Sequence, residues 1–195
     1  MSMTTKSVTK KRSTLTKREE LLMRPIKKFF SEKKNIDTFF NILKGDNEDS
    51  LRLYEWFVVN YSKKYDTRYY ISKDDNTTEE VIVYLDYKSQ LQSYSKKYFD
   101  AFCRTKRIYI SNFDGDKEET TVGQLNFFKW AISKNIINYI KQHREDINND
   151  MIVSLRHLYN KKDTKKKKRR TRKELSISAT KKINKHNVKI IVSFD

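Results

Sequence analysis

The stretch TTVGQLNFFKWAISKNIINYI, residues 120–140, carries the longest helical pattern in the chain and decides the predicted fold. Its apolar residues recur every three or four positions and therefore share one face of a helix. They are Val122, Leu125, Phe128, Ile132 and Ile136. An apolar face of this length needs other elements to pack against. The stretch predicts a folded, mainly helical body.

Further helical patterns lie on both sides of this stretch. The segment that ends at Gly45 spaces its apolar residues like a helix and is expected to form the first core helix. The next helix follows a polar loop in which Asp49 or Ser50 can act as the N-cap. The predicted helices cover residues 36–43, 51–65, 86–100 and roughly 148–159.

Three short segments have the composition of strands. Val81–Leu85 and the segment IYISNF at 108–113 are rich in β-branched and aromatic residues, and so is Val188–Phe194 near the end of the chain. Residues 66–80 are polar and predict a loop or a hairpin tip. The predicted class is α+β, with a mainly helical body packed on a small β-sheet.

The charge of the chain is concentrated at its ends. Its formal net charge is +18, and the run KKDTKKKKRRTRK at residues 161–173 supplies half of that value. Residues 1–34 have a net charge of +8 and residues 160–195 a net charge of +11, whereas residues 35–159 have a net charge of −1. Such dense like charges repel one another and cannot be buried in a core.

The charge pattern and the predicted elements together divide the chain into four parts. We predict a basic flexible arm at residues 1–34 and a globular core at 35–159, followed by a Lys/Arg-rich linker or loop at 160–187. Residues 188–195 are expected to form a C-terminal strand that returns to the core. The Lys/Arg-rich segment would then be a loop held at both ends.

Composition excludes several classes of protein. The chain has one cysteine, Cys103, and therefore neither an internal disulfide framework nor a cysteine-based zinc site. No apolar run approaches the eighteen or so residues of a membrane span, and the N-terminus lacks the apolar block of a signal peptide. We expect no membrane partner, no metal and no cofactor.

Three segments resemble an uncharacterised protein family encoded by the nucleocytoplasmic large DNA viruses, the giant viruses. They are SLRLYEWFVVNYSKKY at 50–65, YKSQLQSYSKKYFDAFCR at 87–104 and TTVGQLNFFKWAI at 120–132. The second segment departs from the family's FDPFCR pattern at Ala101. The resemblance implies a viral protein of the replication factory or the particle, and it carries over no catalytic residues.

Nucleic-acid binding is the function that the charge pattern favours. Each Lys or Arg that meets a phosphate releases condensed counterions, so binding falls steeply with salt and does not read sequence. We predict a non-enzymatic protein that binds DNA in preference to RNA, in genome packaging, virion structure or transcription. The predicted binding residues are Lys161, Lys162, Lys165, Lys166, Lys167, Lys168, Arg169, Arg170, Arg172, Lys173, Lys10, Lys11 and Arg12.

The body offers two further candidates for nucleic-acid contact. A secondary basic face could form from residues on or after the helix at 86–100, although a solvated helix face is the favoured interpretation. These residues are Lys88, Gln92, Lys96, Lys97, Arg104, Lys106 and Arg107. Tyr69 and Tyr70 could stack on bases, with packing in the core or sheet as the simpler interpretation.

Two other interpretations of the basic run remain open. It could bind an acidic viral protein in a structural virion component, because charge alone does not choose between polyanions. The cluster at residues 165–170 also resembles a nuclear import signal. The expected location is the virion or the viral factory in the host cytoplasm, with the host nucleus as the alternative.

A third function, a magnesium-dependent nuclease, rests on Asp86-Tyr87-Lys88 at the end of a predicted strand. It requires a second carboxylate. The candidates are Asp66, Asp74, Asp75, Glu79 and Glu80. The acidic turn at residues 114–119 lacks the spacing of a calcium loop and is expected to be solvated.

Overall fold

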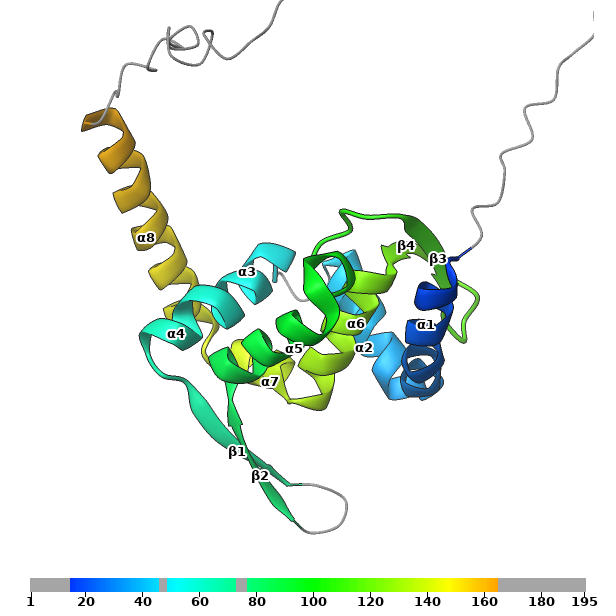
Figure 1. The fold of residues 1–195 in the computed structure, drawn as a ribbon. Coiled ribbons are helices and arrows are strands. Elements are labelled where there is room, and N and C mark those ends of the chain that lie inside the picture. The colour runs from blue at the N-terminus through cyan, green and yellow to red at the C-terminus, as the bar shows by residue number, and fades with distance from the viewer. Residues whose placement is uncertain (1–14, 46–48, 73–76, 165–195) are drawn as a thin grey trace, which may run out of the picture. The chain divides into compact units, whose positions relative to one another are not determined.

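A computed structural model describes residues 15–45, 49–72 and 77–164 of the chain (Figure 1). The chain divides into two units, Met1–Ser154 and Leu155–Asp195, and the packing described below belongs to the first. The elements are α1 (Lys17–Phe30), α2 (Lys33–Lys44), α3 (Leu51–Trp56), a π-helical turn η1 (Phe57–Tyr61), α4 (Ser62–Lys64), β1 (Arg68–Ser72), β2 (Thr78–Ile82), α5 (Val83–Tyr98), β3 (Arg107–Ser111), β4 (Lys117–Thr121), α6 (Val122–Ser133), α7 (Ile136–Gln142) and α8 (Arg144–Thr164). The predicted α+β class with a helical body is confirmed.

Helix α6 forms the centre of the body, as the opening stretch predicts. It is buried around most of its circumference and contacts α1, α2, α5, α7 and β4 (Figure 1). Phe128 is fully buried, with ring centroids 5.5 Å from Phe39 of α2 and 5.6 Å from Tyr54 of α3. These aromatic contacts join helices that are distant in sequence.

The prediction of one continuous helix at residues 120–140 is wrong. The helical stretch is divided at Asn135, whose φ of 57° lies in the left-handed region, and α7 begins at the next residue. Asn tolerates this conformation better than most residues because its short polar side chain can form local hydrogen bonds. The same apolar period continues across the break and still faces the core, since Ile136 and Ile140 are fully buried.

The predicted flexible arm at residues 1–34 is wrong in its second half, because α1 occupies Lys17–Phe30. Thr16 and Glu19 form a capping box, in which each side chain bonds the backbone N–H of the other residue. Helix α1 buries Met23, Ile26 and Phe30 against the body. Residues 1–14 lie outside the described residues.

Pro25 lies inside α1 and does not end it. Proline removes one backbone donor and is unfavourable in a helix interior. Here it faces solvent, and the neighbouring Ile26 is almost completely buried. The packing of the apolar face therefore outweighs the local preference of proline.

The strands form two separate antiparallel hairpins, whereas the sequence predicts one small sheet. In the first, Tyr70 of β1 is paired with Glu80 of β2; in the second, Tyr109 of β3 is paired with Glu119 of β4. The first hairpin projects from the helices (Figure 1). The predicted C-terminal strand at 188–195 lies outside the described residues.

Two predicted boundaries are also corrected. The strand expected at Val81–Leu85 ends at Ile82, and Val83 begins α5. A short apolar run does not distinguish a strand from a buried helix start, which explains the error. The last helix begins at Arg144 rather than near 148. Among the described residues, no helix is long and apolar enough to cross a membrane.

Candidate nucleic-acid interface

The predicted binding residues divide between helix α8 and the undescribed ends of the chain. Lys161 and Lys162 fall within α8. The others, Lys165, Lys166, Lys167, Lys168, Arg169, Arg170, Arg172, Lys173, Lys10, Lys11 and Arg12, lie outside the described residues. The structure therefore leaves these residues as predictions, and it adds a cationic surface on the body.

This surface lies where the start of α1 meets the end of α5. We call it the α1–α5 basic surface and define it by Lys17, Arg18, Lys96, Lys97 and Lys106. Four of its five members are exposed, and Lys106 is partly buried. The capping box at the start of α1 orders Lys17 and Arg18, which follow directly after the N-cap residue.

Tyr98 and Glu19 hold the surface together. The guanidinium of Arg18 lies 5.1 Å from the centre of the Tyr98 ring, and the Lys97 ammonium lies 5.0 Å from the same centre. Each is a cation–π contact. The buried Glu19 carboxylate lies 3.9 Å from Lys106 Nζ. The hydrogen bond from the Thr16 backbone lowers the pKa of Glu19, and the nearby Lys106 and Lys97 lower it further.

The secondary basic face predicted from sequence is therefore partly assembled. Lys97 and Lys106 come together beside Glu19, and Lys96 is exposed next to them in the chain. Arg104 and Arg107 do not add free charge: Arg104 bonds Asp100 at 2.8 and 2.9 Å, and Arg107 bonds Glu119 at 3.0 Å. Lys88 and Gln92 lie on the exposed side of α5, as predicted.

The sequence prediction missed Lys17 and Arg18 because it assigned them to a flexible arm. A signal was present. Thr16 and Glu19 have the spacing of a capping box, and apolar residues at helical spacing follow from Leu22 to Phe30. That pattern marks a helix start just before the two cations.

The start of α6 docks on the end of α5 through buried polar contacts, which we call the α5–α6 junction. Gln124 donates to the carbonyl of Ala101 at 3.0 Å and accepts from the Thr120 hydroxyl at 2.8 Å. Asn126 donates to the carbonyl of Tyr98 at 3.1 Å. These hydrogen bonds pair the Gln124 and Asn126 side chains with groups inside the protein, so the junction is structural.

Gly123 permits this close approach. A Cβ atom built on Gly123 would lie 2.8 Å from the carbonyl oxygen of Lys97, which is closer than real Cβ contacts. The Gly123 carbonyl also accepts a hydrogen bond from the Asp100 N–H at 3.2 Å. Glycine is required here because two backbones touch.

Sequence comparison agrees with the resemblance. All of residues 1–195 match a family of unknown function, DUF7197. The chain belongs to the DUF7197 family. It is also 38% identical over 169 residues to "Uncharacterized protein L507" of Acanthamoeba polyphaga mimivirus, an alignment that covers 84% of this chain and 63% of the relative. No solved structure matches. The predicted relationship to uncharacterised giant-virus proteins is confirmed.

The three sequence blocks that carry the resemblance to giant-virus proteins meet inside this member of the DUF7197 family. Tyr54 from the first block packs on Phe128 from the third. Arg104 from the second block reaches Glu55 from the first at 3.3 Å. The α5–α6 junction joins the second and third blocks. The blocks therefore encode the scaffold of the fold.

The nuclease arrangement predicted at Asp86 does not form in this DUF7197 chain. Asp86 lies in the first turn of α5 and not at a strand end. Its carboxylate accepts from Trp130 Nε1 at 3.1 Å and lies 3.8 Å from Lys134 Nζ, which also pairs with Glu79. Lys88 is exposed. Asp74 and Asp75 lie outside the described residues, and the described ones contain no group of three metal-binding side chains.

The acidic turn between β3 and β4 is exposed to solvent, as predicted, and its carboxylates also form ion pairs. Asp116 pairs with Lys44 at 2.8 Å, and Asp114 lies 3.9 Å from Lys33, so both carboxylates face α2. The Lys44 hydrogen bond lowers the pKa of Asp116. These pairs tie the hairpin to α2.

The two tyrosines considered for base stacking differ. Tyr69 stacks on Tyr139 at 5.1 Å and donates to the carbonyl of Lys134 at 2.7 Å, and burial raises its pKa. Its ring is therefore used in packing. Tyr70 is 70% exposed, which leaves its ring accessible to a ligand.

Proposed function

We propose that this giant-virus protein binds nucleic acid through contacts with the phosphate backbone and has no enzymatic activity of its own. The observation that carries the proposal is the separation of charge: net +8 and +11 at the ends of the chain and −1 between them. Duplex DNA is the proposed ligand in preference to RNA. Binding of this kind would serve genome packaging, virion structure or viral transcription.

The α1–α5 basic surface also supports the proposal, because it adds cations on the folded body to those at the ends of the chain. Lys17 follows Arg12 by five residues, so the cations of the N-terminal arm lead directly to this surface. Lys106 lies 3.9 Å from the buried Glu19 carboxylate, whereas Lys17, Arg18, Lys96 and Lys97 are exposed. Exposed cations with few internal partners keep their charge available for phosphates.

A salt titration with a labelled 20-bp duplex tests the proposal. If about six residues of the run at 161–173 contact phosphate, affinity should fall roughly a thousandfold between about 50 and 200 mM salt. Changing all six residues 165–170 to Gln should lower the slope of log K against log salt by about 5. A single-stranded RNA of equal length, run in parallel, tests the preference for DNA.

The control removes the same charge from the body. Lys28, Lys34, Arg52, Lys63, Lys117 and Lys141 are all exposed. Changing these six residues to Gln should leave the salt slope nearly unchanged, because they lie outside the proposed interface. Equal losses in both variants would show that only the total charge matters.

Three results would overturn the proposed function. Affinity that is indifferent to salt would exclude phosphate binding by the flanks. Crosslinking in purified particles that joins the run at 165–170 to coat protein and never to nucleic acid would favour the alternative, a structural component with an acidic protein partner. Plasmid nicking that depends on Mg²⁺ and is lost in Asp86→Ala would restore the nuclease.

A further inference from the structure

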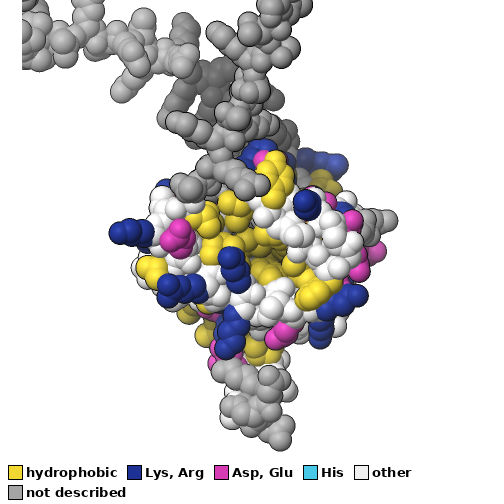
Figure 2. All heavy atoms as spheres, turned by 90° about the vertical axis from the view of Figure 1, so that its right-hand side faces the viewer, with side chains coloured by type: hydrophobic (Ala, Val, Ile, Leu, Met, Phe, Trp, Pro, Cys, Tyr) yellow, Lys and Arg dark blue, Asp and Glu magenta, His cyan; other side chains and the backbone are white. Residues whose placement is uncertain are grey.

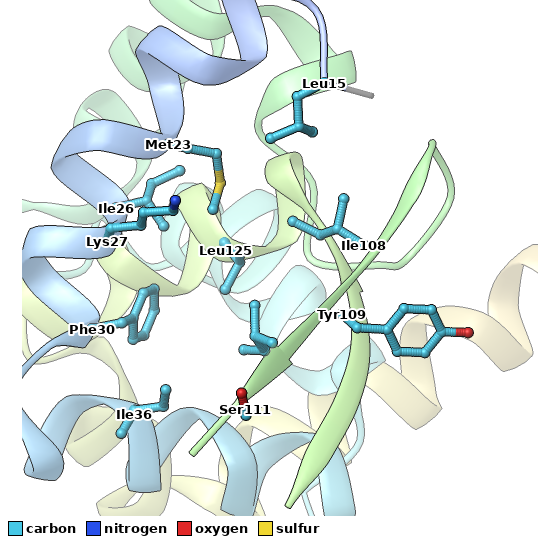
Figure 3. Close-up of a pocket in the computed structure, with 11 residues that line it drawn as sticks. Leu15, Met23, Ile26, Lys27, Phe30, Ile36, Ile108, Tyr109, Ser111 and Leu125 are labelled. Atoms are coloured by element: carbon cyan, nitrogen blue, oxygen red, sulfur yellow. The ribbon is translucent and has the colours of Figure 1, made fainter. Parts of the chain in front are cut away.

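An apolar groove opens on the face of the body that carries α1, β3 and β4. Figure 2 shows it as a hollow of hydrophobic side chains with Lys and Arg around the rim. Its volume is about 370 Å³. Helix α1 lines one wall with Met23, Ile26 and Phe30, and Leu125 of α6 lies between the walls (Figure 3).

The opposite wall of the groove is strand β3. Four consecutive residues of β3 line it, Ile108 to Ser111, although successive side chains of a strand point to opposite faces. Figure 3 shows Ile108 pointing into the groove and the Tyr109 ring pointing away from it. Tyr109 therefore borders the groove with its backbone, so the groove runs along one edge of the strand.

The register of the hairpin shows which backbone groups of β3 face this edge. Next to the turn, Asn112 donates its backbone N–H to the Asp116 carbonyl at 3.1 Å. Hydrogen-bonded and non-bonded pairs alternate along an antiparallel ladder, so Ile110 bonds β4. The backbone groups of Tyr109 and Ser111 then point away from β4. Within the described part of the chain, β3 pairs only with β4, and this edge remains open.

An open strand edge beside an apolar groove is the arrangement that binds an added strand. The edge supplies backbone N–H and C=O groups, and the groove accepts alternate side chains of the incoming segment. Ile108 and Ile110 are only half-buried, and an added strand would bury them further. Removal of apolar surface from water favours such binding.

The charge beside the groove indicates the chemistry of the partner. Lys27 is the one charged side chain among the described residues that line the groove. Helix α1, which forms one wall, has five cations and two acids, a net charge of +3, and one of these acids, Glu19, is buried. The carboxylates of the β3–β4 turn are paired with lysines of α2. The groove is therefore apolar inside and cationic along α1, which complements acidic residues on a partner.

We propose that β3 and α1 dock an extended segment of a partner protein in which acidic residues flank alternating apolar ones. The segment would add to β3 as a third strand, bond the backbone of Tyr109 and Ser111, and place its apolar side chains over α1. A second copy of this chain fits less well, because each copy has a net charge of +18 and the cationic rims would repel each other. The proposal goes beyond nucleic-acid binding and does not depend on it.

Three synthetic peptides, acetylated and amidated at their ends, test the proposal. The probe is Asp-Asp-Val-Thr-Ile-Thr-Val-Asp-Asp, with apolar residues at alternate positions between acids. One control replaces every Asp by Lys, and the other replaces both Thr by Pro and so removes backbone donors. Fluorescence anisotropy of labelled peptides with the full-length chain should show saturable binding of the probe. Both controls should bind at least about tenfold more weakly.

Amide exchange of the full-length chain, followed residue by residue by NMR, locates the docked peptide. In the free protein, the amides of Ile108 and Ile110 should be protected by their bonds to β4, and those of Tyr109 and Ser111 should exchange fast. Saturating probe should slow exchange at Tyr109 and Ser111 by on the order of tenfold or more. An added strand predicts this alternation, whereas a ligand that only fills the groove does not.

Two pairs of variants test the two walls of the groove. Lys27→Glu should weaken binding of the probe about fivefold or more. Lys28→Glu, an exposed position outside the groove lining with the same change in net charge, should not. Tyr109→Pro removes a central N–H of the open edge and should abolish binding, whereas Tyr109→Thr keeps the N–H and should bind. Circular dichroism of each variant checks that the helices are retained.

Equal binding of the three peptides would overturn the proposal, because neither the edge nor its charge would then recognise the segment. Protection of Tyr109 and Ser111 amides in the free protein would also overturn it. The edge would then be occupied by this chain itself if protection persists on dilution, and by a second copy if protection is lost.

The duplex used in the salt titration separates the docking from the proposed function. If the duplex and not the probe protects the Tyr109 amide, the edge belongs to the nucleic-acid interface and the proposal fails. Tyr109→Pro that loses the probe and keeps the salt slope for DNA would support the docking and leave the proposed function unaffected. Probe binding that is retained in a chain indifferent to DNA would support the docking alone.

Discussion

The α5–α6 junction and the α1–α5 basic surface lie next to each other and share Tyr98, but their polar groups behave differently. At the junction, the Tyr98 carbonyl accepts from Asn126 and the surrounding amides are paired inside the protein. On the basic surface, the Tyr98 ring faces the cations of Arg18 and Lys97. The polar groups of the α5–α6 junction are hydrogen-bonded inside the protein. Four of the five cations of the α1–α5 basic surface are exposed and can bind a ligand.

The comparison shows where function should be sought in this family. The blocks that identify the DUF7197 chain by resemblance supply the junction and the aromatic core. Packing and buried hydrogen bonds account for the residues of these blocks. Exposed charges with few internal partners are better guides to a binding site, and the predictions below separate the two regions by stability and by DNA affinity.

The largest effect is expected from Gly123→Val. The added side chain would collide with the Lys97 carbonyl oxygen, which is backbone and cannot rotate away. We expect a loss of about 3 kcal/mol of folding stability or more, since overpacking of a rigid site forces the backbone to move. Chemical denaturation followed by circular dichroism measures it.

The control for this prediction is Gly45→Ala. Gly45 has a φ of +75°, and nothing lies within 4 Å of an added Cβ. Its cost is conformational only and should be about 1 kcal/mol. Equal losses in the two variants would mean that the close approach at Gly123 is not important for stability.

The second prediction concerns Gln124→Leu. This change keeps the approximate size of the side chain and leaves the buried Ala101 carbonyl and Thr120 hydroxyl without their partner. An unsatisfied buried polar group costs roughly 1–3 kcal/mol, and we expect a loss of about 2–3 kcal/mol in total. Gln142→Leu, at an exposed position of α7, should change stability by less than about 0.5 kcal/mol. A neutral Gln124→Leu would contradict the structural role of the junction.

The third prediction concerns Asp150, whose carboxylate accepts hydrogen bonds from Lys64 and Trp56. Burial alone would raise its pKa, but hydrogen bonds from Lys64 and Trp56 outweigh burial, and the pKa is lowered. A carboxylate whose pKa is lower in the folded state stabilises the fold above its unfolded pKa of about 3.9. That stability is lost as the pH falls through the folded pKa.

Asp150→Asn should therefore cost about 1–2 kcal/mol at neutral pH and should flatten the loss of stability on acidification below about pH 5. Urea unfolding at several pH values measures both effects. Asp146→Asn, at an exposed position of α8, is the matched control and should leave the acid transition where it is. An unchanged pH profile in Asp150→Asn would exclude the proposed pairing.

Sequence predicted the helices correctly where apolar residues recur at regular helical spacing. The burial of α6 follows from apolar residues that recur over about four turns, from Val122 to Ile136. The exposed and inner faces of α5 were also predicted correctly, with Lys88 outside and Tyr98 inside. Local spacing was sufficient for α6, which is buried along most of its length, whereas α5 is interrupted by non-helical backbone at Ser95 and is buried at Val83 and Tyr98.

The errors arise where distant contacts override local preference. Residues 1–34 were predicted to be a flexible arm, but the burial of Ile26 and Phe30 keeps α1 intact around Pro25. The division of the strands into two hairpins depends on pairings such as that of Tyr109 with Glu119, which no period in the sequence specifies. The pairing of Asp116 with Lys44 joins residues 72 positions apart.

The smallest effect on stability, and the most informative about function, is expected from changing Lys17, Arg18, Lys96 and Lys97 together to Gln. The two cation–π contacts with Tyr98 and the attraction between Lys97 and Glu19 are lost inside the protein, and the folding stability should fall by less than about 1 kcal/mol. DNA affinity should fall much more, because each lost phosphate contact lowers the salt slope by about 0.9 and four contacts lower it by about 3 to 4. A variant with Lys28, Lys34, Lys117 and Lys141 changed to Gln has the same net charge and should keep the slope. If both variants bind DNA equally well, the body only carries the charged ends, and the α1–α5 basic surface is a solvated face like any other.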